Sequence, residues 1–267
     1  MKPSGLLIIF ILVTVILCLS RYAGTFMPTV IINLDRSPDR LFQMTLQCYL
    51  YGIPFHRHPA VDGNTHIYTD KEKQTLFGLA LRRQTKIDTS TFKHTPEERI
   101  KLYETWETQE SFKKTRRIMA CSLSHFQVWE RYKNTTDPYI IVLEDDGKIN
   151  SHFRQQVNTS ITHLNTFDPN WDIMWLSGKD PEDREQVAHW NSYAVYRMDP
   201  PKYIGQGAGA YILSRKGIKY FLKVLEEKGC SDGADFFLLN NLILEHGYGI
   251  HPPLVDIHSS GPSTIVL

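Results

Sequence analysis

The sequence predicts an α/β fold in which a mainly parallel, twisted sheet carries helices on both faces. Short apolar runs rich in β-branched residues, typical of buried strands, recur along the chain. Segments with the helical spacing of apolar residues separate them, so strands and helices alternate. A group of acidic residues follows one of the apolar runs, and open α/β sheets bind ligands at the carboxyl ends of their strands. The 267 residues suffice for one large core.

The N-terminal segment differs in kind from the rest of the chain. Residues 6–19 are almost wholly apolar, with Lys2 before them and Arg21 after them. About 15 apolar residues are short for a bilayer span, for which about 20 are usual. A clear signal-cleavage pattern does not follow them. We therefore expect residues 1–24 to be a signal anchor and residues 25–267 to form one lumenal domain of a type II membrane protein of the ER or Golgi. Secretion after signal cleavage is the alternative.

Two N-glycosylation sequons, which begin at Asn134 and Asn158, agree with a lumenal location. Outside the anchor the cysteines are Cys48, Cys121 and Cys230, an odd number. One disulfide with one free thiol and three free thiols are both open. The net charge of +1 provides no strong attraction to nucleic acid, and we expect no such partner.

The first half of the domain opens with a strand, a turn and a helix. The strand is expected over residues 29–34. Ser37 and Pro38 are suited to the N-cap and first turn of a helix that ends near Tyr51, before Gly52. A second strand is expected over 56–63. Residues 65–117 are polar, charged and without clear strands. They indicate a variable, largely helical insertion, either a lid or acceptor loop or an ordinary surface excursion. The basic cluster 113–117 is interpreted as a solvated face.

The second half continues the alternation of helices and strands. Helical spacing over 119–132 leads into the apolar run 139–143, which is announced by Asp137-Pro138. A helix is expected over 152–167, and strands over 171–176 and 192–198. A small-residue turn at 207–209 leads into a strand over 210–213, and a capped helix follows over 214–227. The last elements expected are a helix over 232–245 and a strand over 249–257.

Three adjacent acids, Glu144, Asp145 and Asp146, end the apolar run 139–143. Neighbouring carboxylates repel one another, so their ionised forms are costly without a cation. A divalent ion held by one or two carboxylates and by substrate phosphates would supply that cation. The triplet therefore predicts a metal–diphosphate site of a nucleotide-sugar enzyme, against the alternative of a solvated acidic turn. Asp146 lies furthest into the loop and is the expected direct ligand.

Several motifs in order along the chain resemble one known family. They are the opening strand 30–36 with Arg40, the segments 60–63, 121–125 and 143–146, the block 207–217, and Asp235. Together they resemble glycosyltransferase family 25, which includes bacterial lipooligosaccharide and procollagen hydroxylysine galactosyltransferases. The resemblance covers about residues 30–263. It implies a GT-A-type nucleotide-sugar-binding fold, a UDP-sugar donor and a divalent metal, with Mn²⁺ the first candidate.

The resemblance also implies roles for single residues. Donor binding is expected from Asn33, Asp35, Arg36, Arg40, Asp62, Ser124, His125, Glu144, Asp145, Gly207 and Gly209. Metal ligands are expected to be Asp146, Glu144 and His258. An inverting displacement needs a general base, for which Asp235 is the candidate. Its competitor is Asp232, which is also suited to capping the helix. The structural alternatives are core packing for His125 and turn formation for Asp62, Gly207 and Gly209. For Asn33, Asp35, Arg36 and Arg40 the alternative is helix capping with a surface ion pair, and for His258 it is a surface histidine.

The expected function is therefore metal-dependent, inverting transfer of a hexose from a UDP-sugar to a hydroxyl of a glycan or a hydroxylysine-containing protein. Galactose is the first candidate for the sugar, and glucose stays open. The alternative from another class is a non-catalytic glycosyltransferase-like protein that acts in adhesion or scaffolding, since a fold does not guarantee an activity. A nucleotide-sugar hydrolase is a third hypothesis. It is distinguished from a transferase by whether an acceptor accelerates cleavage of the nucleotide-sugar.

Overall fold

The structure is a computed structural model that describes residues 26–85, 94–178, 185–198, 207–242 and 244–257 of the chain. The expected anchor over residues 1–24 and the candidate ligand His258 lie outside these ranges. Within them, no helix combines the length and the apolar character that crossing a bilayer requires.

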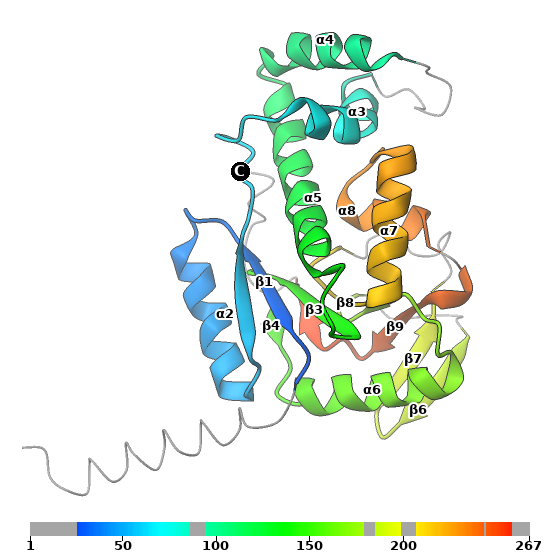
Figure 1. Cartoon of the computed structure of the whole chain (residues 1–267). Helices are drawn as coiled ribbons and strands as arrows, with labels where there is room; N and C mark the ends of the chain where they lie inside the picture. Colours follow the sequence, from blue (N-terminus) through cyan, green and yellow to red (C-terminus); the bar gives the residue numbers. More distant parts are fainter. Residues whose placement is uncertain (1–25, 86–93, 179–184, 199–206, 243, 258–267) are drawn as a thin grey trace, which may run out of the picture.

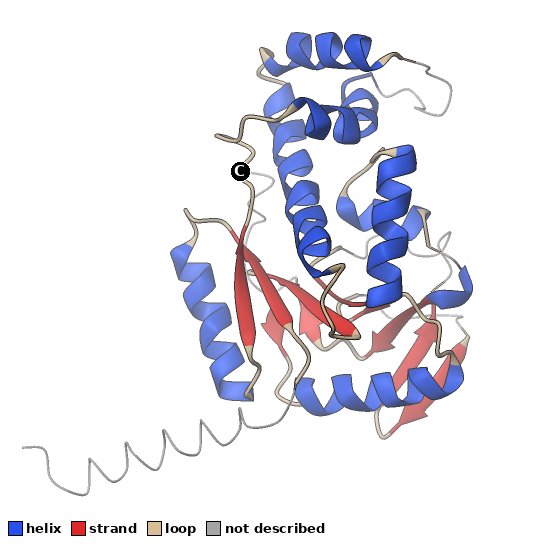
Figure 2. Ribbon diagram, in the orientation of Figure 1, coloured by secondary structure: helices blue, strands red, loops and turns tan. Residues whose placement is uncertain are grey.

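An eight-stranded sheet forms the centre of the molecule (Figure 2). Its strands, in spatial order, are β2 (Phe55–Pro59), β1 (Thr29–Asn33), β3 (Tyr139–Glu144), β8 (Ala210–Ser214), β5 (Ile173–Trp175), β9 (Gly247–His251), β7 (Tyr193–Arg197) and β6 (Gln186–Trp190). A small second sheet pairs β4 (Lys148–Ile149) with β10 (Val255–Asp256). The chain is thus an α/β protein, as its sequence predicts.

The large sheet is mixed, which corrects the expectation of a mainly parallel one. β1 pairs in parallel with β2 and with β3, and β5 pairs in parallel with β9. β8, in contrast, runs antiparallel to both of its neighbours, β3 and β5, and β7 runs antiparallel to β6 and β9. A buried strand is apolar whether it runs parallel or antiparallel to its neighbours. The alternation of strands and helices along the chain therefore did not reveal the strand directions.

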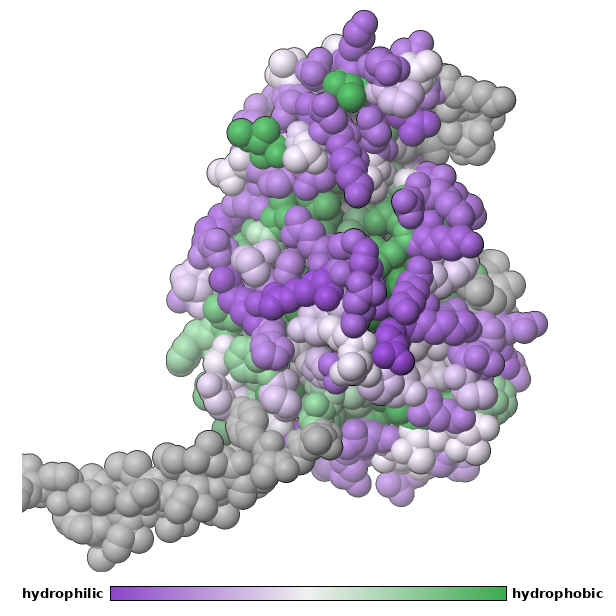
Figure 3. All heavy atoms as spheres, viewed as in Figure 1, coloured by the Kyte–Doolittle hydropathy of each residue, from purple (hydrophilic) through white to green (hydrophobic). Residues whose placement is uncertain are grey.

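Helices cover both faces of the sheet, as expected (Figures 1 and 2). On one face lie α2 (Pro38–Tyr51) and α6 (Phe153–Phe167), and on the other lie α5 (Phe112–Tyr132), α7 (Arg215–Lys228) and α8 (Ala234–Asn240). α3 (Asp70–Thr85) and α4 (Pro96–Glu107) pack at the far end of α5, away from the strands, and the 3-10 turn η3 (Leu244–His246) precedes β9. The face seen in Figure 3 is largely hydrophilic over these helices.

Each face of the sheet has its own hydrophobic core. One core joins alternate strand residues such as Ile32 and Tyr211 to α3, α5, α7 and α8, and includes the fully buried Trp129. The other joins the intervening strand residues, such as Ile31 and Ile212, to α2 and α6. Because side chains alternate along a strand, one continuous apolar strand supplies both cores.

Local signals in the sequence account for several helix ends. Pro38 opens α2, and Gly52 ends it in the left-handed conformation with φ of 64°. Ser37 occupies the N-cap position, but its side chain makes no capping hydrogen bond, contrary to expectation. Ser214 does cap α7, since its hydroxyl oxygen accepts the Gly217 amide at 2.9 Å.

Other boundaries differ from the expected ones. The second strand ends at Pro59, so residues 60–63 form the loop after it. The insertion 65–117 is largely helical where described, and α5 starts inside it, at Phe112. β6, which was not expected, completes a hairpin with β7, and the last expected strand is two strands in different sheets. The expected helix 232–245 is shorter, because Asn241 ends α8.

Candidate active site

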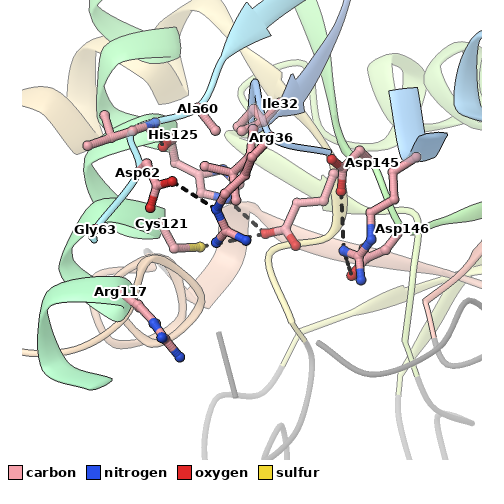
Figure 4. Close-up of a pocket in the computed structure, with 15 residues that line it drawn as sticks. Ile32, Arg36, Ala60, Asp62, Gly63, Arg117, Cys121, His125, Asp145 and Asp146 are labelled. Atoms are coloured by element: carbon pink, nitrogen blue, oxygen red, sulfur yellow. Dashed lines mark hydrogen bonds and ion pairs between the residues drawn. The ribbon is translucent and has the colours of Figure 1, made fainter. Parts of the chain in front are cut away.

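A cleft that is open to solvent lies at the carboxyl ends of β1, β2 and β3 (Figure 4). These three strands run parallel, so the loops that follow them meet at one edge of the sheet. Helix α5 supplies a further wall. The cleft is lined by Ile32, Leu34, Arg36, Arg40, residues 60–63, Arg117, Cys121, Ser124, His125 and residues 144–146. Much of the predicted site is therefore one continuous surface.

Asp145 is held by groups of the protein itself. Asn33, at the end of β1, donates its amide hydrogen to Asp145 Oδ2 at 2.5 Å. Arg40, from α2, lies with Nη1 at 3.5 Å from Asp145 Oδ1. Burial raises the pKa of Asp145, and the hydrogen bond from Asn33 and the charge of Arg40 oppose that rise. Asp145 thus fixes the loop after β3 to the first strand and helix.

Asp146 is the least compensated acid of the triplet. Its Oδ1 atom is buried and has no hydrogen-bond partner among the described residues, and its Oδ2 atom lies 3.6 Å from Arg40 Nη1. Burial, followed by the charges of Glu144 and Asp145, raises its pKa to about 6. A buried oxygen without a partner beside other carboxylates is the environment that a divalent cation would satisfy.

Glu144 faces α5 across the floor of the cleft. Its Oε1 atom lies 3.1 Å from His125 Nε2 and 3.9 Å from Cys121 Sγ. The other nitrogen of His125 lies 2.8 Å from the Tyr211 hydroxyl, and the ring is fully buried. Both ring nitrogens are thus engaged inside the protein. His125 lines the cleft, but both of its nitrogens already have partners within the protein. These contacts favour a role in holding Glu144 over a direct hydrogen bond from His125 to a nucleotide-sugar.

Arg36 and Asp62 form the opposite wall of the cleft (Figure 4). Arg36 Nε donates to Asp62 Oδ2 at 2.8 Å. Asp62 Oδ1 accepts the Asn64 amide at 2.9 Å, so Asp62 also forms the turn after β2 that was the structural alternative. Arg117, on α5, donates to the Asn64 side chain at 3.1 Å and completes this wall. Three arginines, counting Arg40, therefore border an acidic floor.

Asp35 and Ser124 have local roles in this structure. The Asp35 side chain is 82% exposed, pairs with Arg57 and does not line the cleft. Arg57 also donates from Nε to the Asn33 side chain at 3.0 Å, so it supports the residue that holds Asp145. The Ser124 hydroxyl accepts the Val61 amide at 2.9 Å and donates to the Ala120 carbonyl at 2.8 Å. It ties the loop after β2 to α5.

Gly207 and Gly209 do not line the cleft directly. Gly207 is exposed. Gly209 is buried, and its carbonyl accepts the Glu144 amide at 2.8 Å. A Cβ atom at Gly209 would lie 2.5 Å from the end of the Ile257 side chain, so that side chain would have to shift to admit alanine there.

Asp235 lies in the first turn of α8 and does not line the cleft, but its charge acts on two lining residues, Glu144 and Cys121. Burial raises its pKa, and the negative charge of Glu144 raises it further. Its competitor Asp232 is an ion-pair residue instead. It pairs with Arg82 and Arg83 of α3, and Gly233 occupies the N-cap position of α8.

The cysteines and sequons also have defined surroundings. Cys48, Cys121 and Cys230 are free thiols, which agrees with the second of the two alternatives. Burial raises the pKa of Cys48 and of Cys230 to about 12, and that of Cys121 well above its usual value. Asn134 and Asn158 are both exposed.

Some residues of the site were not predicted. Arg57 and Arg117 lie in segments interpreted as a strand and a solvated basic face. Within that face, Arg116 and Arg117 in fact contact the loop after β2. Two signals in the sequence could have pointed to these residues: Arg57 is a charged residue within a strand, and Arg116 and Arg117 are arginines at the end of a lysine cluster. Tyr211 was hidden in an apolar run.

Comparison with known proteins relates the sequence of this chain to one family. Residues 26–235 match the family described as glycosyltransferase family 25 (LPS biosynthesis protein). Over 158 residues the chain is 23% identical to a probable inactive glycosyltransferase 25 family member 3 of Rattus norvegicus and to an inactive glycosyltransferase 25 family member 3 of Mus musculus. It is 31% identical over 65 residues to procollagen galactosyltransferase 1-A of Xenopus laevis.

These matches are partial. The first two cover 59% of this chain but 24% and 23% of the relatives, and the third covers 24% of this chain and 11% of the relative. The chain thus spans about a quarter or less of the length of these relatives. Among solved structures, apo mouse xyloside xylosyltransferase 1 aligns over 83% of this chain and 75% of its own, with 11% identity and a TM-score of 0.28.

Proposed function

Since this chain belongs to glycosyltransferase family 25, we propose that it transfers a hexose from a UDP-sugar to a hydroxyl group of a glycan or of a hydroxylysine-containing protein. Galactose is the first sugar to test, because one relative is named a procollagen galactosyltransferase. In this proposal the mixed sheet with its helices is a GT-A-type fold, and the transfer inverts the anomeric centre.

One observation carries the proposal. The acids after β3, the arginines of the cleft and the turn after β2 come from distant parts of the chain and line a single cleft. Arginine presents a planar array of donors that suits phosphate oxygens. Arg36, Arg40, Arg117 and Asp62 line the cleft. In this proposal the arginines bind the diphosphate, and Asp62 accepts hydrogen bonds from sugar hydroxyls.

The residues of the floor fit a divalent metal ion, for which Mn²⁺ is the first choice. Asp146 would hold it through its unpartnered oxygen, with Glu144 as the second ligand among the described residues. Asp145 is already engaged by Asn33 and would support the loop. Such an ion supplies positive charge that stabilises the diphosphate leaving group. His258, the third expected ligand, remains a proposal because it lies outside the described residues.

Asp235 is the proposed general base. A base that removes the acceptor proton works best when its pKa lies nearer to neutrality than that of a free carboxylate. Burial and the neighbouring charge of Glu144 shift the pKa of Asp235 in that direction. Replacement by asparagine keeps the shape of the side chain and removes its basicity, so transfer should be lost while UDP binding is kept.

The test is release of UDP from a panel of UDP-sugars by the full chain, with glycan and collagen-peptide acceptors, in Mn²⁺ or in a chelator. We expect Mn²⁺-dependent release from one donor, accelerated by an acceptor, and a loss of at least about a hundredfold in Asp146→Asn. Asp70→Asn removes an exposed acid of α3 outside the cleft and serves as the control. Equal release in wild type and Asp146→Asn would contradict the proposed site.

A second candidate function is a non-catalytic adhesion or scaffolding role. It is favoured by the names of the two relatives that are called inactive or probably inactive. Absence of both UDP release and UDP binding would make it the better explanation. Donor cleavage that no acceptor accelerates would instead point to a nucleotide-sugar hydrolase.

The proposed location rests on the sequence alone. We propose that residues 1–24 anchor the chain as a type II membrane protein with its enzyme domain in the ER or Golgi lumen, and secretion after cleavage is the alternative. The exposed sequon residues Asn134 and Asn158 are accessible to a glycan on this view.

A further inference from the structure

A buried chain of hydrogen bonds runs from the core to the floor of the cleft. Trp129 Nε1 lies 2.9 Å from the Tyr211 hydroxyl oxygen, which lies 2.8 Å from His125 Nδ1. His125 Nε2 lies 3.1 Å from Glu144 Oε1. Trp129, Tyr211 and His125 are each fully buried. Trp129 and His125 lie one turn apart on α5, and Tyr211 projects toward them from β8.

For a neutral His125 ring, the chemistry of these groups fixes the direction of every hydrogen bond. The indole N–H of Trp129 can only donate, so the Tyr211 oxygen accepts from it. The Tyr211 hydroxyl has one hydrogen, and among the described residues the one acceptor within reach is His125 Nδ1. Nδ1 therefore accepts, and a neutral ring carries its hydrogen on Nε2. That hydrogen is donated to Glu144.

The reverse arrangement is disfavoured. If His125 carried its hydrogen on Nδ1, the Tyr211 oxygen would accept from both Trp129 and His125. The hydroxyl hydrogen of Tyr211 would then lack an acceptor among the described residues at a site without solvent, and burial of an unpaired donor is costly. Glu144 would in addition face a bare nitrogen lone pair instead of a donor.

We propose that Tyr211 is a positioning residue of this site: it sets the tautomer of His125, and His125 in turn holds one oxygen of Glu144. Glu144 needs such support because Asp145, Asp146 and Asp235 place negative charge around it. The inference rests on the proposed function, in which Glu144 contributes to donor and metal binding. Tyr211 itself does not line the cleft and is assigned no contact with substrate.

The decisive measurement is the tautomer of His125 in the full chain, read from long-range ¹H–¹⁵N spectra of histidine-labelled protein and assigned with His125→Asn. We expect the Nε2–H form alone in the wild type and a mixture of both tautomers in Tyr211→Phe, which cannot donate to Nδ1. Mn²⁺-dependent UDP release should fall about ten- to a hundredfold in the same variant, as is typical when support for a metal ligand is lost.

Tyr248→Phe is the matched control. Tyr248 is also a fully buried tyrosine of the large sheet, and its hydroxyl contacts Asp168 and the Glu245 carbonyl away from the cleft. The Tyr248→Phe variant should change neither the tautomer of His125 nor the release of UDP. An Nδ1–H tautomer in the wild type, an unchanged tautomer in folded Tyr211→Phe, or full UDP release by that variant would overturn the proposal.

Failure of the proposed function would look different. In that case the wild type would release no UDP from any donor. The Mn²⁺-dependent affinity for UDP would then be measured for Tyr211→Phe and for the wild type. An unchanged affinity would overturn the positioning role. If Tyr211→Phe did not fold, the tautomer of His125 in the wild type would still test the proposal. An Nδ1–H tautomer there would contradict the proposed hydrogen bond from Tyr211 to His125 without the need for a variant.

Discussion

At the scale of single residues, the site is held in an unfavourable electrostatic state by its neighbours. Asp145 and Asp146 share one arginine, Arg40, and Asp146 keeps a buried oxygen without a partner. Burial and neighbouring acids raise the pKa of Asp146 to about 6, above its ordinary value of 3.8. Functional sites commonly carry such costs, because the missing partner arrives with the ligand.

This cost predicts that Asp146→Asn stabilises the metal-free protein. A carboxyl group whose pKa is raised in the folded state stabilises the fold at low pH and loses that contribution as pH rises through about 6. Above that pH the ionised group opposes folding. In EDTA at about pH 7.5 the variant should therefore unfold with a free energy roughly 1–3 kcal/mol larger than the wild type.

Urea denaturation at several pH values checks this prediction. The difference should shrink as the pH falls and approach zero only below about pH 3, where the folded and the unfolded wild type both carry the proton. Asp70→Asn, at an exposed acid, should show no comparable gain. An Asp146→Asn protein that is less stable than the wild type at pH 7.5 would show that the acid does not oppose folding.

At the scale of elements, the sequence predicted best those features that depend on interactions between residues close together in the chain. Pro38 and Gly52 mark the ends of α2, and the acids after β3 mark the cleft, because each acts on its own neighbourhood. Strand direction depends on which distant strands meet, and no residue within those strands reports it. The β6–β7 hairpin is local, because Trp190 pairs with Tyr193, and its turn signal, Asn191 with φ of 50°, was not used. The Ser37 N-cap was inferred from residue type, and its side chain makes no such bond.

The loop after β2 gives a prediction at this scale. A Cβ atom at Gly63 would lie 2.7 Å from the Arg116 carbonyl oxygen and from Arg117 Cα, both backbone atoms of α5. Gly63→Ala must therefore push the loop and the helix apart. We expect a loss of roughly 1–3 kcal/mol in stability and weaker UDP binding, because Asp62 and Arg117 would move.

The control is Gly207→Ala, since a Cβ atom there meets no described atom closer than 3.8 Å. Thermal unfolding should separate the two variants, with Gly207→Ala close to the wild type. Equal stability of Gly63→Ala and the wild type would show that the loop does not need this close approach to α5.

At the scale of the whole molecule, segments far apart in sequence build one site. The helical insertion packs on α5, and its Arg82 and Arg83 pair with Asp232, three residues before Asp235. The insertion is thus tied to the segment that carries the proposed general base. Sequence motifs identified most of the residues of the cleft, but not Arg117. They also missed Arg57 and Tyr211, which lie outside the cleft and support it, because the roles of all three exist only through contacts across the fold.

The most direct test of the central claim is calorimetric titration of UDP into the full chain, in Mn²⁺ and in EDTA, for wild type and Asp146→Asn. The account predicts that Mn²⁺ strengthens UDP binding to the wild type by at least about tenfold, and that Asp146→Asn removes this gain while the arginines retain weak binding. UDP binding that is equally strong with and without Mn²⁺, or absent in both, would contradict a metal–diphosphate site at the end of β3.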